Sequence, residues 1–161
     1  MIFVTVGTQK FQFNRLFQKL DELKQENKIQ DEIISQIGYS TYKPKHYKHY
    51  EMLSSKEVST FLSDSEICIC HAGTSSIIQA LKYEKKVIVV PRKKEFGEHV
   101  DNHQEEIASM FYDLGFIEVV DNIDNLVNII GLVREKEFNQ YNFDNRSLLS
   151  SIRNDIDGFI K

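Results

Sequence analysis

The sequence predicts an α/β fold in which helices cover both faces of a parallel β-sheet. Short apolar runs alternate along the chain with segments whose apolar residues recur at a helical spacing. Such alternation is typical of a parallel sheet, because each crossover between neighbouring strands carries a helix. The 161 residues, of which 41% are hydrophobic, are enough for one domain with a substantial core.

The first half of the chain contains three predicted strands and two helices. The first strand covers residues 2–7, and Asn14 is suited to cap the helix that follows, whose apolar residues recur with a period near 3.6. The second strand covers residues 32–38. Ser55 is expected to cap a short helix, which leads the chain into a third strand at Ile67.

The second half continues the same pattern. A helix begins after the turn at Gly73, and a strand at residues 87–91 follows it. After a charged loop come a helix at residues 101–114 and a strand at residues 116–120. Residues 122–133 are predicted to be helical, which completes the alternation.

Residues 1–161 are predicted to form a single domain, with residues 138–161 as a C-terminal helical tail. The apolar residues of this tail either pack on the domain or contact a partner. No run approaches the ~18 apolar residues of a membrane span, and the N-terminus lacks the basic leader of a signal peptide, so we expect a cytoplasmic protein. A net charge of −4 argues against a general nucleic-acid binder.

For three further features we favour a structural explanation over a functional one. Cys68 and Cys70 are expected to be reduced core thiols on opposite faces of their strand, where they cannot easily share a metal. The Asp-x-Asp sequence at residues 155–157 lies in the tail, and we expect no metal ligation there. Residues 42–50 interleave cations with aromatics and are predicted to be a solvated loop, with base stacking or contact with a lipid headgroup or a pyrophosphate acceptor as alternatives.

Polar clusters follow three of the predicted strands, at residues 7–9, 71–76 and 92–104. In parallel sheets, ligands bind beyond the carboxyl ends of the strands, at a topological switch point. We therefore expect the three clusters to converge on one edge and to form a site. The loop after the third of these strands is longer and more densely charged than a simple connection requires.

The turn at Gly73 indicates a phosphate site. The missing Cβ of this glycine lets backbone approach a ligand, and Thr74 and Ser75 open a helix whose free amides and dipole attract phosphate. The alternative is that Thr74 is merely a helix cap. The turn matches neither the full P-loop nor the Rossmann glycine fingerprint, so the turn alone does not decide between the two.

Four motifs together resemble glycosyltransferase family 28: residues 3–8 (FVTVGT), 71–74 (HAGT), 89–91 (VVP) and 101–104 (DNHQ). Within that family the chain is most similar to the small catalytic subunits of two-component UDP-sugar transferases. The resemblance covers residues 1 to about 120. It implies a Rossmann-like sheet equivalent to the C-terminal, donor-binding half of a GT-B enzyme, with the acceptor-binding half on a separate membrane-anchored partner.

The resemblance also implies which residues bind the donor. Gln79 falls where relatives carry an acidic residue that grips the ribose, and this departure weakens the implied ribose contact because an amide accepts through only one oxygen. The implied donor-binding residues are Gly7, Thr8, Gly73, Thr74 and Ser75 around the diphosphate, Gln79 at the ribose, and Asn102, His103 and Gln104 at the donor sugar.

The implied reaction is an inverting displacement at the anomeric carbon that needs no metal or other cofactor. His71, Glu98 and His99 are the candidate catalytic residues, and His103 is a further candidate acid–base group. For His71 and His103 we favour a positioning role, and the base can equally come from the partner protein. Glu98 and His99 are expected on a flexible loop that faces the acceptor.

The expected function is transfer of a hexose or N-acetylhexosamine from a UDP-sugar to a saccharide linked to a lipid pyrophosphate, in capsule or exopolysaccharide biosynthesis. A membrane-anchored partner would recruit the cytoplasmic chain to the inner face of the membrane, and no nucleic-acid partner is expected. One alternative is a noncatalytic module that binds or senses UDP or a UDP-sugar. The runner-up enzyme is a self-sufficient UDP-sugar hydrolase or a homodimeric transferase.

Overall fold

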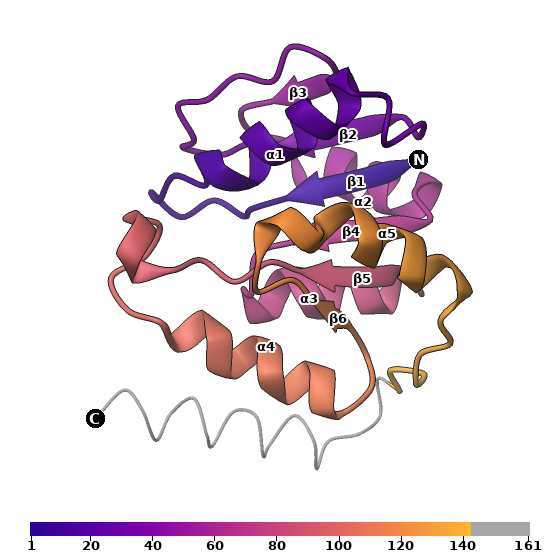
Figure 1. Cartoon of the computed structure of the whole chain (residues 1–161). Helices are drawn as coiled ribbons and strands as arrows, with labels where there is room; N and C mark the ends of the chain where they lie inside the picture. The colour runs from indigo at the N-terminus through magenta and orange to yellow at the C-terminus, as the bar shows by residue number, and fades with distance from the viewer. Residues whose placement is uncertain (143–161) are drawn as a thin grey trace.

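The computed structural model describes residues 1–142, which form one six-stranded, wholly parallel sheet with the order β3-β2-β1-β4-β5-β6 (Figure 1). All five strand pairings are parallel, so the predicted α/β class is confirmed. The strands are β1 (Ile2–Thr5), β2 (Ile33–Gln36), β3 (Lys48–Tyr50), β4 (Ile67–Cys70), β5 (Lys86–Val89) and β6 (Glu118–Val119).

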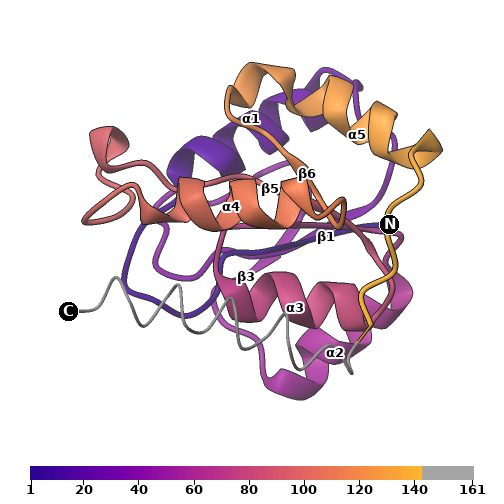
Figure 2. The same cartoon turned by 90° about the horizontal axis from the view of Figure 1, so that it is seen from below.

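Helices cover both faces of the sheet. Helices α1 and α5 lie on one face, and α2 and α3 lie on the other, while α4 runs beside β6 at the sheet edge (Figure 2). The helices are α1 (Asn14–Gln25), α2 (Ser55–Asp64), α3 (Thr74–Lys82), α4 (His103–Asp113) and α5 (Leu126–Glu135), with short 3₁₀ turns η1 (Lys94–Phe96) and η2 (Ile123–Asn125).

The central strand β1 is buried on both faces. Ile2 and Val4 pack with α1 and α5, whereas Phe3 packs in the second cluster with residues of α2 and α3. All four residues of β1 are buried, and burial on both faces fits the unbroken apolar run of its first three residues, Ile2, Phe3 and Val4.

The two cysteines lie on the same face of β4, and the expectation of opposite faces was wrong. Residues two apart in a strand project to the same side of the sheet. Cys68 and Cys70 are both buried in the second cluster and both are free. The neighbouring Cys68 thiol and burial raise the pKa of Cys70, and both residues are free core thiols, as predicted.

Two helix starts differ from the sequence prediction. Ser54, not Ser55, caps α2: its Oγ accepts from the backbone N–H of Glu57, and the Glu57 carboxylate accepts from the N–H of Ser54 at 2.8 Å. Asn14 is the first residue of α1 and does not cap it. Its Oδ1 accepts from the backbone of residue 41 at 2.9 Å and so holds the β2–β3 connection against α1.

The cationic segment at residues 42–50 is only partly a loop. Lys48–Tyr50 forms the edge strand β3, which the sequence reading missed because the strand is short and cationic, as edge strands often are. Asp21 organises the rest of the segment by accepting from the hydroxyl of Tyr42 at 2.7 Å and from the N–H of His46 at 2.8 Å. Burial opposes the ionisation of Asp21, yet these hydrogen bonds hold its pKa below the ordinary value.

The start of the expected helical tail is not helical. Residues 138–142 are irregular, and the ring of Tyr141 packs edge-on against Phe116 at 5.6 Å. The beginning of the predicted tail therefore packs on its own domain. The remainder, including the acidic residues at 155–157, lies outside the described residues.

Residues 1–142 contain neither a membrane-spanning helix nor a side-chain cluster suited to a metal ion. No helix in this range is long and apolar enough to cross a membrane. The same range contains no group of three or more histidine, cysteine or acidic side chains that could hold a metal ion.

Candidate functional site

The topological switch point of the sheet lies between β1 and β4. From β1 the chain continues to β2 on one side, and β4 later pairs with the opposite side of β1. Because β1, β4 and β5 are parallel neighbours, the loops that follow them leave the sheet on the same side, where the carboxyl ends of the strands lie (Figure 1). We call this side the strand-end edge. This edge is where a ligand of an open α/β sheet binds.

The imidazole of His71 occupies the centre of this edge, packed between two glycines. A Cβ on Gly73 would lie 2.2 Å from Nε2 of His71, and a Cβ on Gly7 would lie 2.9 Å from its Cε1. Gly7 also has φ +68°, a left-handed conformation that favours glycine. The missing Cβ of Gly73 therefore makes room for the His71 ring, whereas the sequence predicted that a ligand occupies this space.

His71 is neutral at physiological pH. Its side chain is buried, and that burial, followed by the nearby charge of Arg92, lowers its pKa from 6.5 to about 3. A group with this pKa accepts a proton poorly at neutral pH. The geometry therefore favours a packing role for His71 over the catalytic role.

The N-terminus of α3 is suited to bind an anion. Gly73 is the N-cap, no side chain makes a capping hydrogen bond, and the first turn carries no acidic residue. Thr74 is the first helical residue and not the cap, and Ser75 beside it is exposed. By contrast, the first turn of α4 carries Glu105 and Glu106, which already satisfy its dipole. Of these two helix starts at the strand-end edge, only that of α3 favours phosphate.

The loop after β1 is held by a residue that the sequence reading missed. Gln36, at the end of β2, donates from Nε2 to the carbonyl oxygen of Gly7 at 3.0 Å and accepts at Oε1 from the N–H of Leu53 at 3.3 Å. Thr8 follows in this loop and is exposed, and Gln79 is half-buried on α3. A polar residue inside a buried strand was the only sequence signal for Gln36.

Arg92, directly after Pro91, is a fully buried cation that the sequence reading also missed. Its Nη2 donates to the carbonyl oxygens of Val6 at 3.1 Å and Phe11 at 3.2 Å. Its Nε and Nη1 have no hydrogen-bond partner within the described chain. Burial lowers the pKa of Arg92 to about 10, so the guanidinium stays charged at neutral pH. It joins the loops after β1 and β5 and makes the site electropositive from within.

The residues expected to read the donor sugar are largely engaged with their own loop. Gln104 is buried, and its Oε1 accepts from the N–H of Arg92 at 3.1 Å, so only its amide NH₂ is left for a ligand. Oδ1 of Asn102 accepts from the N–H of Lys94 at 2.9 Å. His103 is half-buried at the first position of α4. Gln104 and Asn102 thus each use a side-chain oxygen to hold the loop after β5, and their predicted contact with the donor sugar stays a prediction.

The sequence predicted that Glu98 faces an acceptor from a flexible loop, but the structure buries this residue. Its side chain is fully buried and accepts two parallel hydrogen bonds from Arg15, Nε to Oε1 and Nη2 to Oε2, both at 3.0 Å. Its Oε2 also accepts from the N–H of Lys93 at 3.0 Å. Both carboxylate oxygens are occupied, which is the geometry of a positioning residue.

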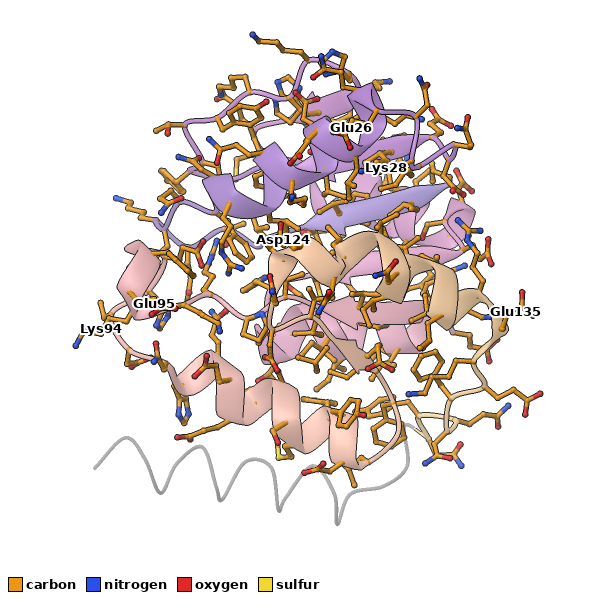
Figure 3. All side chains as sticks on the ribbon, viewed as in Figure 1. Glu26, Lys28, Lys94, Glu95, Asp124 and Glu135 are labelled. Atoms are coloured by element: carbon orange, nitrogen blue, oxygen red, sulfur yellow. The ribbon has the colours of Figure 1, made fainter. Side chains whose placement is uncertain are left out.

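Of the three candidate catalytic residues, His99 is the one that reaches the surface of this edge. Its side chain is 16% exposed, and its ring lies 4.8 Å from the ring of Phe11 in the loop after β1. Its Nδ1 lies 2.9 Å from Oδ1 of Asp101. Figure 3 shows Lys94 and Glu95 on the neighbouring η1 pointing outward from the same end of the molecule.

These features define a class of protein: a Rossmann-like α/β domain whose switch point carries a helix start without a side-chain cap or an acidic first turn. The model of the glycosyltransferase family 28 C-terminal domain matches residues 1–156. The chain belongs to this family.

Curated relatives are UDP-N-acetylglucosamine transferase subunits named ALG13. The protein from Debaryomyces hansenii is 36% identical over 122 residues, which cover 70% of this chain and 55% of the relative. The protein from Saccharomyces cerevisiae is 38% identical over 64 residues, which cover 40% of this chain and 30% of the relative. The chain thus spans little more than half the length of the first of these relatives.

Solved structures show the same fold. A solution structure of ALG13 has a TM-score of 0.61 at 19% identity and covers 94% of this chain and 93% of that chain. The glycotransferase of kitacinnamycin has a TM-score of 0.65 at 14% identity, with 84% and 35% covered. Acinetobacter baumannii MurG has a TM-score of 0.55 at 16% identity, with 82% and 41% covered. The predicted equivalence to the C-terminal half of a GT-B glycosyltransferase is confirmed at the level of the fold.

Proposed function

We propose that this chain is the donor-binding, catalytic subunit of an inverting UDP-sugar glycosyltransferase. It transfers a hexose or N-acetylhexosamine to a saccharide linked to a lipid pyrophosphate, and a membrane-anchored partner binds that acceptor. The setting we propose is capsule or exopolysaccharide biosynthesis at the inner face of the membrane. The proposed reaction uses no metal and no other cofactor.

The observation that carries this proposal is the start of α3 at the β1–β4 switch point. Its first turn has neither a side-chain cap nor an acidic residue, so its amides are available to an anion. The buried cation of Arg92 lies close enough to lower the pKa of His71, which packs against the N-cap Gly73. A nucleoside diphosphate supplies the negative charge that both groups favour.

Family membership and the named relatives support a sugar nucleotide donor. The chain belongs to the glycosyltransferase family 28 C-terminal domain family, and its relatives are named as subunits of a UDP-N-acetylglucosamine transferase. A subunit implies a second protein in the same enzyme. UDP-N-acetylglucosamine is therefore the first donor to test.

The chemistry follows from the placement of charge. In the proposed reaction an acceptor hydroxyl attacks the anomeric carbon, the bond from that carbon to the UDP oxygen breaks, and the configuration inverts. Negative charge grows on the departing diphosphate as this bond breaks. Oriented amides at the start of α3 stabilise that charge more strongly in the transition state than in the ground state, which is how they accelerate the reaction.

The decisive experiment is calorimetry of the full chain with UDP, UDP-N-acetylglucosamine, UDP-glucose and ADP. Ser75→Asp places a negative charge in the exposed first turn of α3, where it repels a diphosphate but suits the helix dipole. We expect UDP binding to weaken at least about tenfold while the domain stays folded. The matched control is Ser55→Asp, which puts the same charge at the exposed first position of α2 and should leave UDP binding unchanged.

The same variants separate the competing functions. If Ser75→Asp binds UDP like the wild type, the diphosphate does not sit at α3. UDP binding without transfer from any donor, even with partner-containing membranes, would indicate the noncatalytic sensing module. Transfer or hydrolysis by the isolated chain would indicate the self-sufficient enzyme.

A further inference from the structure

The three candidate catalytic residues, His71, Glu98 and His99, differ in their access to an acceptor. A base that takes a proton from a hydroxyl must come within hydrogen-bonding distance of it. His71 is only 5% exposed and Glu98 is 0% exposed. Both carboxylate oxygens of Glu98 already accept hydrogen bonds from Arg15. His99 is 16% exposed, on the segment between η1 and α4. Of the three, only His99 combines access with a free ring nitrogen.

The pairing of His99 with Asp101 decides which ring nitrogen is free. Nδ1 of His99 lies 2.9 Å from Oδ1 of Asp101, and an ionised carboxylate only accepts, so Nδ1 carries the proton. The N–H of Asp101 also lies 3.5 Å from Nδ1, at the limit for a hydrogen bond, and the shorter carboxylate contact sets the tautomer. The lone pair of the neutral imidazole is therefore on Nε2.

Asp101 is itself held in place and kept ionised. Its Oδ1 accepts from the backbone N–H of His103 at 3.1 Å. That bond, together with the contact to His99, holds the pKa of Asp101 below its ordinary value. On the other side the ring of His99 packs against Phe11 at 4.8 Å. Two loops therefore fix the orientation of the imidazole, and the adjacent Glu98 anchors the segment to Arg15.

We propose that His99 is the general base of the transfer and that Asp101 is its positioning residue. The inference rests on the proposed function. As the acceptor oxygen bonds to the anomeric carbon, the hydroxyl proton passes to Nε2 of His99, and the electron pair of the breaking bond leaves with UDP. The imidazolium then releases its proton to solvent. Asp101 stabilises the imidazolium without taking the proton.

The first test needs neither partner nor substrate. Long-range ¹⁵N–¹H spectra of the labelled full chain at pH 8 should show His99 protonated at Nδ1 and bare at Nε2. Asp101→Asn replaces the carboxylate that accepts from Nδ1 and should therefore raise the fraction of His99 that is protonated at Nε2 in the same spectra. A wild-type His99 protonated at Nε2 would overturn the proposal.

The second test is kinetic, with UDP-N-acetylglucosamine as donor and with membranes that contain the partner but lack this subunit. His99→Gln should lower kcat by about 10²- to 10⁴-fold, with UDP affinity unchanged within twofold. Asp101→Asn should lower kcat about tenfold with KM for the donor unchanged, because the imidazole loses the carboxylate that fixes its tautomer. His46→Gln, which alters an exposed histidine paired with Asp21, is the control and should match the wild type.

The outcomes separate this inference from the proposed function. Wild-type kcat in His99→Gln, or a wild-type kcat and an unchanged His99 tautomer in Asp101→Asn, overturns the assigned roles while leaving the transferase intact. Absence of both UDP binding and transfer in the wild type overturns the proposed function, and the base assignment with it.

Discussion

The guanidinium of Arg15 on α1 grips the carboxylate of Glu98 through two hydrogen bonds of 3.0 Å, in a fork-to-fork arrangement. Arg15 also donates to the carbonyl oxygen of Pro91 at 3.1 Å, and its guanidinium carbon lies 4.9 Å from the ring centroid of Phe96. Because β4 lies between β1 and β5 in the sheet, these contacts bridge the end of β4. They close the loop after β5 onto the first helix.

Breaking this ion pair should destabilise the domain. Glu98→Ala leaves the Arg15 charge without its partner, and Arg15→Ala leaves a carboxylate at 0% exposure unpaired. We expect each to lower the free energy of unfolding by about 3 kcal/mol, as measured by urea denaturation. The double variant Arg15→Met/Glu98→Leu replaces both charges by apolar groups and should cost less than either single change. A cost of the double variant equal to the sum of the two single costs would refute the pairing energy.

Gly73 and His71 should be energetically coupled. A Cβ at Gly73 would lie 2.2 Å from Nε2 of His71, although the φ of −80° suits any residue. Gly73→Ala should therefore cost about 1 to 3 kcal/mol by overpacking. In a His71→Ala background the same change should be nearly neutral, because the clashing ring is gone. Additive costs in this double-mutant cycle would show that Gly73 is needed for another reason.

Gly131 provides the matched control for that cycle. It lies within α5, and a Cβ there would meet no atom within 4 Å. Gly131→Ala should therefore stabilise the domain by about 0.5 to 1 kcal/mol through helix propensity alone. It should show no coupling to His71→Ala.

The buried His71 should make stability fall on acidification. Its folded-state pKa is lowered to about 3 from 6.5, so between these values the unfolded state binds more protons than the folded state. Stability is therefore complete above pH 6.5 and is lost as pH falls through the window. From pH 8 to pH 5 the contribution is about 2 kcal/mol. Urea denaturation of wild type and His71→Asn should show that difference, and identical pH dependence of the two would contradict it.

Gln104 should have separable structural and ligand-binding roles. Gln104→Ala removes the acceptor for the buried N–H of Arg92 and should cost about 1 to 3 kcal/mol of stability in thermal denaturation. Gln104→Glu keeps an acceptor there but replaces the amide NH₂. We expect this variant to fold normally. In calorimetry its affinity for UDP-N-acetylglucosamine should fall about tenfold more than its affinity for UDP. Equal weakening of both ligands would place Gln104 at the nucleotide.

Much of the fold was predictable because its determinants are local. The apolar runs that became β1, β4 and β5 are buried on both faces of a parallel sheet, and such burial requires continuous apolar sequence. Strand ends were predicted a residue or more too long, because burial continues past the last ladder hydrogen bond. β3 was missed because its three residues have the composition of a solvated loop.

The candidate site was likewise predictable only where its determinants are local. The sequence by itself determined that polar loops follow β1, β4 and β5 and therefore share one edge, since parallel strands align their carboxyl ends. Only the tertiary structure decided what each side chain does there. Glu98 and Arg15 are 83 residues apart, and Arg92 and Val6 are 86 apart. Pairings at such separations depend on how the sheet stacks its loops, and no local spacing encodes them.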